Sequence, residues 1–393
     1  MKKGSLDIII TLIFYIGIGL YLYYNGLSQS NMQEGGALVP RFVLLLPFTV
    51  VILQTMRIIS DKGRHVTDQL TKPWLYIFIY YVCALLIGGL TNQGLVDYNT
   101  VWYVIVPPAT WIYFSYVVRK IPEIEHILVK WSFWILLILS IISIYFIPRS
   151  ITLAGRFASL NTGYYVLFAY PMVLLDKSKT KKTIATILMI LVILLSMKRG
   201  GMVVVVMAFF LYFLLSSNRH IWRKIALGTV LVYVVTFYLV PKVNEYSGGT
   251  LEARYEFTKN QGDEEGRSTI YAQVWKKAWN SSGMEILFGH GHKAVTADRV
   301  CDGVAAHNDY LEFLYDFGMI GLLLLLLYQE RLAVLTYMSR KYNIDFLPTI
   351  FAFCIILVLS SVSIVYAYSY FALLIPFWCI MNNRIRAIKK TIK

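Results

Sequence analysis

A histidine, an asparagine and three carboxylates stand at the start of an apolar run in residues 303–327, GVAAHNDYLEFLYDFGMIGLLLLLL. Asp309 and Glu312 have the D-x-x-E spacing of a helix N-terminal capping box, and their charges suit the positive end of a helix dipole. Asp316 lies two turns further into the run, where a charge is costly and marks a functional residue by default. The pattern predicts that Asp309 and Glu312 cap a helix and that Asp316 pairs with an arginine of another segment.

His307 is the residue of this stretch that is best suited to acid–base chemistry. The positive end of a helix disfavours the imidazolium, so a histidine here is neutral at pH 7 and can accept a proton from a hydroxyl group. A histidine that only caps the helix or packs in the core is the alternative interpretation. We expect His307 to act as a general base.

Four basic residues lie in turns where positive charge is unusual. Lys198 and Arg199 lie in the short turn SMKRGGM, and Arg149 and Arg156 lie in the connector after the apolar run 131–147. Membrane proteins concentrate Lys and Arg in cytoplasmic loops, and the alternation of apolar runs places these turns on the other side. The pattern indicates either anchors to lipid headgroups or a site for an anionic ligand.

An amphipathic helix is predicted over residues 267–280, RSTIYAQVWKKAWN. Tyr271, Trp275 and Trp279 recur at i, i+4 and i+8, and Arg267 precedes them by one turn. Such a helix either rests on the membrane surface with Trp at headgroup depth or forms an aromatic wall for sugars or lipid. The two interpretations are compatible.

Two patterns could suggest a metal, and both are weak. His290 and His292 form an H-x-H pair in EILFGHGHKAV without a neighbouring cluster of ligands. Asp309, Glu312 and Asp316 share one helical face and could hold a divalent cation, which is an alternative to catalysis by a histidine base. We expect no metal and no other cofactor.

These residues are predicted to lie at the ends of membrane helices and in the loops between them. Of the 393 residues, 58% are hydrophobic and 15% are charged, whereas a soluble domain carries about a quarter charged residues. The predicted fold class is therefore an all-α polytopic membrane protein. Its twelve predicted spans are 6–24, 40–59, 73–90, 100–118, 131–147, 160–175, 182–196, 201–215, 223–240, 308–328, 346–364 and 366–381.

The distribution of charge predicts the topology and the domain plan. An even number of spans puts both termini in the cytoplasm, where the basic tail RIRAIKKTIK belongs. The N-terminal segment has no small-residue cleavage site and is interpreted as an uncleaved first span. The plan is nine spans over 1–240, a periplasmic loop with the amphipathic helix over 241–307, and three spans with a cytoplasmic tail over 308–393.

Charge and cysteine content narrow the partners. The net charge of +15 follows from the topology and implies no nucleic-acid partner. The four cysteines imply neither a disulfide nor a thiolate metal site.

Three segments resemble the O-antigen polymerase and O-antigen ligase superfamily (Wzy and WaaL) of bacterial envelope glycosyltransferases. They are GRFASLNTGYY at 155–165, SMKRGG at 196–201, and the composite GRSTIYAQVW…FGHGH…HNDYLEFLYDFGMIG at 266–321. The composite is similar to the family's Arg…Trp…Gly-x-Gly…His-Asn-x-x-Leu…Gly-x-x-Gly signature. In the second segment Lys198 replaces the usual serine, and Arg199 keeps the arginine.

The resemblance implies a GT-C-like fold and a donor glycan linked to undecaprenyl pyrophosphate, without a nucleotide sugar. In such enzymes periplasmic arginines hold the pyrophosphate, and the histidine of His-Asn acts on the acceptor. Carried over by position, the catalytic roles fall on Arg199, Arg267 and His307. The further candidate contacts to substrate or lipid are Lys198, Arg149, Arg156, Asn308, Tyr271, Trp275 and Asp316.

The predicted function is O-antigen polymerase at the periplasmic face of the bacterial inner membrane. It would transfer a lipid-linked glycan onto a lipid-linked repeat unit, with inversion at the anomeric carbon. One alternative is a ligase that transfers the glycan to lipid A–core. The other is a flippase for lipid-linked oligosaccharide, although the sequence shows neither a repeat between its halves nor the pair of broken spans that marks transport sites. The implied partners are the lipid-linked donor and acceptor and membrane lipid, with a chain-length regulator and a flippase as candidate partner proteins.

Overall fold

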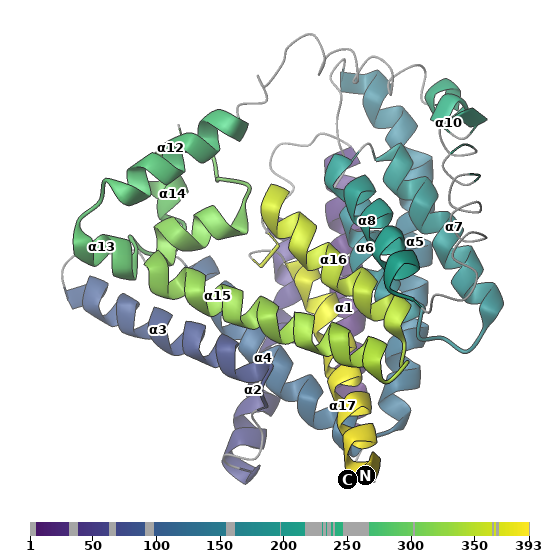
Figure 1. Cartoon of the computed structure of the whole chain (residues 1–393), viewed down its shortest axis with the longest axis horizontal. Helices are drawn as coiled ribbons and strands as arrows, with labels where there is room; N and C mark the ends of the chain where they lie inside the picture. Colours follow the sequence, from purple (N-terminus) through teal and green to yellow (C-terminus); the bar gives the residue numbers. More distant parts are fainter. Residues whose placement is uncertain are drawn as a thin grey trace.

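The computed structural model consists of helices, with no strand among the residues that it describes (Figure 1). The described residues are 5–30, 38–62, 68–90, 98–154, 162–196, 198–216, 230, 233, 237–238, 240–246, 267–301, 303–363, 365–366 and 369–392. The helices are α1 (Ser5–Ser30), α2 (Leu38–Lys62), α3 (Thr71–Leu90), α4 (Tyr98–Lys120), α5 (Glu123–Ala154), α6 (Thr162–Val173), α7 (Lys179–Leu195), α8 (Arg199–Leu215), α10 (Val240–Tyr246), α12 (Arg267–Trp279), α13 (Gly283–Phe288), α14 (Ala294–Ala297), α15 (Asp309–Lys341), α16 (Phe346–Val362), the 3₁₀ helix η3 (Ser369–Leu373) and α17 (Leu374–Ile392).

Four helical stretches of the described chain are long and apolar enough to cross a membrane. They are Ser5–Asn25, Val43–Asp61, Glu123–Tyr145 and Asp309–Lys341, which confirms an all-α membrane protein. The number of twelve spans and the GT-C-like plan stay predictions, because most of the expected ninth span, 223–240, lies outside the described residues.

One expected boundary is wrong. The sequence predicts a connector after residue 147, but α5 continues as a helix to Ala154 and includes Arg149. Polar residues are compatible with a helix that extends beyond the apolar layer, so a change in hydropathy marks the end of a span rather than the end of the helix.

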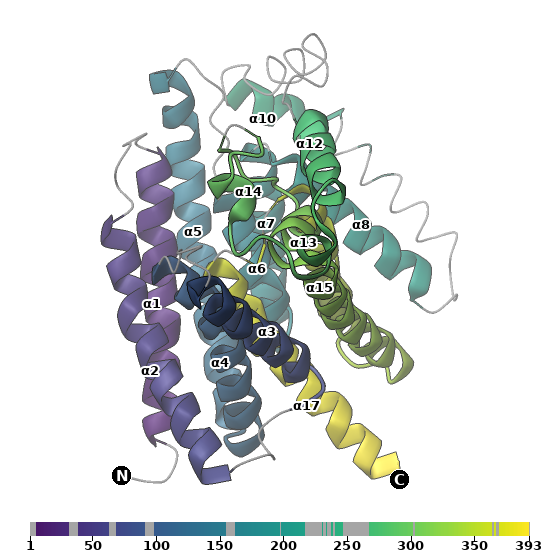
Figure 2. The same cartoon turned by 90° about the vertical axis from the view of Figure 1, so that its left-hand side faces the viewer.

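The helices form a bundle whose two ends differ. α1 packs against α2 and α5, and α8 packs along α16, around fully buried aromatic side chains such as Phe14, Trp111 and Trp378. In both views the start of α1 and the end of α17 lie at one end, and α12–α14 lie toward the other (Figures 1 and 2). The predicted topology requires the two termini to lie at one end and α12–α14 toward the other. Which end faces the cytoplasm stays a prediction.

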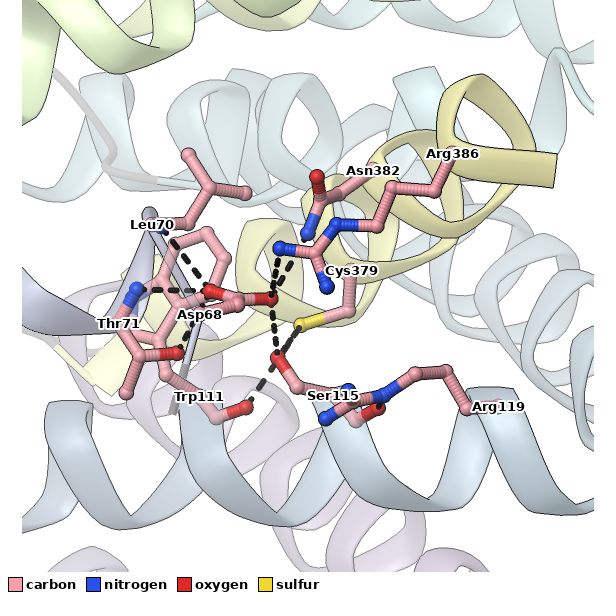
Figure 3. Close-up of polar contacts among 9 residues, drawn as sticks. All are labelled: Asp68, Leu70, Thr71, Trp111, Ser115, Arg119, Cys379, Asn382 and Arg386. Carbon is pink, nitrogen blue, oxygen red and sulfur yellow. Dashed lines mark hydrogen bonds and ion pairs between the residues drawn. The ribbon is translucent and has the colours of Figure 1, made fainter. Parts of the chain in front are cut away.

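A buried carboxylate joins the start of α3 to α17 (Figure 3). Asp68 accepts hydrogen bonds at Oδ1 from the backbone N–H groups of Leu70 and Thr71, at 3.0 and 2.9 Å. Its Oδ2 accepts from Asn382 Nδ2 at 2.8 Å and lies 3.7 Å from Arg386 Nη2. Asp68 is 5% exposed, and both of its carboxylate oxygens have partners. These contacts hold the start of α3, the helix that also contacts α13.

α15 is interrupted near its start. Gly318 has φ 66° and ψ −169°, outside the helical region. The turn at residues 289–291 packs against this interruption through two backbone hydrogen bonds. The sequence pattern of residues 303–327 does not predict this break in α15.

Candidate active site

His307 is held by side chains of the first turn of α15. Its φ of 52° is a left-handed backbone conformation. On one side, the Glu312 carboxylate accepts from the N–H of Ala306 at 2.6 Å. On the other side, Asn308 Oδ1 accepts from the N–H groups two and three residues further on, at 3.0 and 3.1 Å. The backbone is therefore anchored both before and after His307.

The helix cap differs from the predicted one. The N-cap of α15 is Asn308, and the D-x-x-E capping box at Asp309 and Glu312 is wrong. Asp309 instead accepts from the backbone N–H of Val365, at 3.1 and 3.0 Å to its two oxygens. Asn and Asp are nearly equal as N-caps, so the sequence could not decide which of the two adjacent residues would do this.

Tyr271 connects α12 to the loop that carries His307. Its hydroxyl lies 3.3 Å from the carbonyl oxygen of His307 and 3.3 Å from that of Ser361, and it can donate to either. Asn308 Nδ2 donates to the same Ser361 carbonyl at 3.0 Å. The last carbonyl groups of a helix have no partner within the helix, and the end of α16 uses them to join α12 to α15.

Arg267 and the start of α8 meet at Val362, the last residue of α16. Arg267 Nη1 donates to the Val362 carbonyl at 3.4 Å. Gly200 approaches so closely that a Cβ there would lie 2.9 Å from Val362 Cγ2 and 2.9 Å from the Tyr164 hydroxyl oxygen. The ammonium of Lys198 lies 5.2 Å from the centre of the Tyr164 ring, within cation–π range. Segments far apart in the sequence therefore converge here.

Two positive charges act on the imidazole of His307. Burial lowers the pKa of His307, and the charges of Arg267 and Lys198 lower it further. The ring is therefore neutral at pH 7, and one of its nitrogens can accept a proton. The helix dipole and burial against the loop already favour the neutral form from the sequence, and the structure adds the charges of the two cations.

The arrangement suits the binding of an anion beside a proton acceptor. Arg267 supplies a guanidinium, Lys198 supplies an ammonium, and Arg199 is exposed at the first position of α8. Burial raises the pKa of the Tyr271 phenol, so its hydroxyl stays a neutral donor. A phosphate group could therefore bind within reach of a neutral imidazole.

The described residues place one predicted contact, Trp275, outside this cluster. Trp275 is exposed on α12, and its ring makes an edge contact with Trp279 at 5.5 Å. The side chain of Arg149 and the whole of Arg156 lie outside the described residues. These contacts stay predictions.

Asp316 contacts the start of α14 rather than the residues of this cluster. Its carboxylate accepts from the backbone N–H groups of Lys293 and Val295, at 2.6 and 3.2 Å, and the residue is 4% exposed. Within the described part of the chain, the expected ion pair with an arginine is absent, because backbone donors from the adjacent segment take its place.

Three contributors were missed by the sequence reasoning. Tyr164 lies in the quoted segment GRFASLNTGYY, where an aromatic residue at the start of a predicted span is the signal that could have found it. The carbonyl groups of Ser361 and Val362 are backbone atoms, so their participation has no sequence signal.

Among the described residues, the H-x-H pair belongs to no group of three metal-ligating side chains. The His290 ring stacks on Tyr315 at 4.1 Å between ring centres, and its Nε2 lies 3.1 Å from the hydroxyl of Ser281. His290 therefore has a packing role.

Comparison with known proteins finds a family model that covers part of this cluster. Residues 184–326 match the model described as O-antigen ligase, over somewhat more than a third of the chain. This match supports the resemblance to the O-antigen polymerase and ligase superfamily. Members of the matched family are glycosyltransferase-like enzymes of O-antigen biosynthesis. The matched stretch includes Lys198, Arg199, Arg267 and His307. No curated protein matches the chain.

Proposed function

We propose that the chain is an O-antigen polymerase, a glycosyltransferase of the bacterial inner membrane with its active site at the periplasmic face. The donor is a glycan linked to undecaprenyl pyrophosphate, and the acceptor is a lipid-linked repeat unit. The observation that carries this proposal is the convergence of the His307 loop, Arg267 and the start of α8 at the end of α16. The family match over the same residues supports it.

The reaction is a single displacement at the anomeric carbon of the donor. The bond from that carbon to the pyrophosphate oxygen breaks, and a bond to the acceptor hydroxyl oxygen forms. His307 takes the hydroxyl proton as the oxygen attacks. The undecaprenyl pyrophosphate leaves with the electron pair, and the anomeric centre is inverted.

The basic residues stabilise the charge that grows on the leaving group. A guanidinium stays charged and grips phosphate oxygens in a fork, which suits Arg267 and Arg199. Lys198 adds a point charge from the start of α8. Loss of one such donor commonly costs on the order of a hundredfold in rate. The proposed transfer is metal-independent, because these side chains supply the positive charge.

A ligase is the second candidate, because the matching family model is described as O-antigen ligase. The donor and the chemistry would be the same, and only the acceptor would change to lipid A–core. Three-dimensional arrangement alone does not settle an acceptor.

Reconstitution tests the proposal and separates the candidates. Purified protein in liposomes is given lipid-linked repeat units, with or without lipid A–core, and with no ion gradient. A ladder of lengthened lipid-linked glycan without lipid A–core supports the polymerase. Product only on lipid A–core supports the ligase. If neither product forms, the proposal that the chain is a glycosyltransferase is contradicted.

A further inference from the structure

α13 reaches deep along a predicted membrane helix although it belongs to the predicted periplasmic loop. Tyr80 lies in the middle of α3 (Thr71–Leu90). Its hydroxyl donates to the carbonyl of Phe288, the last residue of α13, and lies 3.1 Å from the carbonyl oxygen of Phe317. The rings of Tyr80 and Phe288 stack at 6.3 Å. A loop in the aqueous phase would contact only the end of such a helix.

The turn after α13 is inserted against the break in α15. Gly318 lies nine residues after Asp309, about 14 Å along the helix. The break frees carbonyl groups, and the N–H groups of the turn pair with them. His290 N–H donates to Tyr315 at 3.0 Å, and Gly291 N–H donates to Asp316 at 2.8 Å.

Two glycines permit this approach of backbone to backbone. A Cβ at Gly289 would lie 2.3 Å from the Asp316 carbonyl oxygen, and a Cβ at Gly318 would lie 2.4 Å from the Leu287 carbonyl oxygen. Both residues have positive φ, 78° and 66°. The segment and α15 therefore interlock without side chains between them.

The buried carboxylate of Asp316 completes the pairing of backbone groups. It accepts from the N–H groups of Lys293 and Val295 at the start of α14. Irregular backbone at membrane depth is tolerated only where its polar groups are satisfied by protein or water. The break in α15 and Asp316 together meet this requirement, which explains a carboxylate two turns inside a predicted span.

One side of α13 is apolar, while its one carboxylate, Glu285, accepts from the Ser282 N–H at the start of the helix. Met284, Leu287 and Phe288 are 66%, 47% and 43% exposed, and Tyr76 and Ile79 of α3 are 53% and 55% exposed. The Tyr80–Phe288 contact makes these two surfaces continuous. An exposed apolar surface of this kind on a segment in water would be a liability for aggregation, whereas beside a membrane helix it faces lipid.

We propose that residues 283–297 form a re-entrant segment embedded in the outer leaflet of the membrane. The side chains of Met284, Leu287 and Phe288 contact phospholipid acyl chains, while the turn at 289–291 is sealed against the break in α15. This assigns the segment to the lipid phase rather than to the aqueous loop, and it does not depend on the reaction that the protein catalyses.

Cysteine accessibility in lipid membranes tests this placement. The background is Cys83→Ser, because Cys83 is the exposed one of the four free cysteines. Met284→Cys and Leu287→Cys probe the apolar surface, and Lys276→Cys on the exposed face of α12 is the matched control. The probe is a charged maleimide applied to membrane fragments that are open on both sides, so the orientation of the protein does not matter.

Maleimide reacts with the thiolate, which apolar surroundings suppress. We expect positions 284 and 287 to label at least about tenfold more slowly than position 276, and to label fully after SDS is added. Labelling of positions 284 and 287 at the rate of position 276 would overturn the proposal. If Leu287→Cys does not fold, position 284 decides, since the Met284 side chain is mostly exposed and its replacement removes little packing.

Discussion

The imidazole of His307 can act as a base only while it is neutral, and its surroundings favour the neutral form. Burial and the charges of Arg267 and Lys198 all lower its pKa. The same two cations that would bind pyrophosphate therefore keep the base unprotonated when the site is free of substrate. Bound pyrophosphate would offset part of this effect, because its negative charge favours the imidazolium that forms as the acceptor loses its proton.

Replacement of Lys198 by methionine should move the acid side of the pH–rate profile to higher pH. Activity is lost as pH falls through the pKa of His307, and removal of a neighbouring positive charge raises that pKa. The measurement is the kcat/KM for glycan transfer between about pH 5 and 8. Lys276→Met is the control, because Lys276 lies on the exposed face of α12. An acid side that stays in place in Lys198→Met would contradict the electrostatic assignment.

Removal of divalent cations should leave the reaction unchanged. The three carboxylates at the start of α15 accept hydrogen bonds from separate backbone segments. Asp309 accepts from Val365, and Glu312 accepts from Ala306. Asp316 accepts from Lys293 and Val295. A cation shared by these carboxylates would have to displace those bonds. Transfer is measured with and without EDTA, and a loss that Mn²⁺ or Mg²⁺ restores would support the alternative in which carboxylates hold a metal.

The candidate site was predictable where residue type carries the signal. Lys198 stands out by its place in an outer turn and His307 by its place at the start of a helix, whereas the catalytic role of Arg267 comes from the resemblance to the family signature. The contributions of Ser361 and Val362 come from backbone carbonyls at a helix end, and any residue could supply them. Asn308 rather than Asp309 caps α15, because Asp309 accepts from the N–H of Val365. Val365 is distant in sequence, so this choice could not be predicted.

At the scale of elements, the interlock between the turn at 289–291 and the break in α15 holds the start of α15 in place. The first turn of α15 carries the side chains that fix His307. The break itself had no sequence signal beyond a glycine, because the driving contact is the backbone of another segment. The helix at α12, by contrast, was predictable within one residue from its aromatic periodicity.

Gly318→Ala should destabilise the protein. The added Cβ would meet the Leu287 carbonyl oxygen at 2.4 Å, and the positive φ adds strain, so we expect a cost of at least about 1–3 kcal/mol. Gly283→Ala is the matched control, because no atom lies within 4 Å of a Cβ there. Thermal unfolding of the detergent-purified variants measures the difference, and equal unfolding temperatures for both would show that the break is not required.

At the scale of the whole molecule, the site lies where α8, α12, α15 and α16 meet, toward the end of the bundle opposite the termini (Figures 1 and 2). Composition was enough to predict an all-α membrane protein. It was not enough to predict which helices pair, because apolar surfaces carry little information about partners. The packing of α8 along α16 brings the Lys198 turn to the site. This pairing is seen in the structure and could not be predicted from the sequence.

Both termini should lie in the cytoplasm and the segment 267–307 on the periplasmic side. The start of α1 and the end of α17 share one end of the bundle (Figure 2), and their basic residues favour the cytoplasm. Reporter domains that are active only in the periplasm are fused at the C-terminus and inserted near residue 260. Activity at residue 260 and none at the C-terminus is expected, and the reverse pattern would refute the topology.

The most direct test of the account is glycan transfer by purified protein in liposomes, comparing the parent chain with His307→Ala and with His290→Ala. Loss of a general base costs about 10²–10⁴-fold in rate. We predict this loss for His307→Ala, with unfolding temperature retained. His290→Ala, which removes a ring that packs on Tyr315, should keep most of the transfer rate per folded protein. Full transfer activity in His307→Ala would contradict the proposed site.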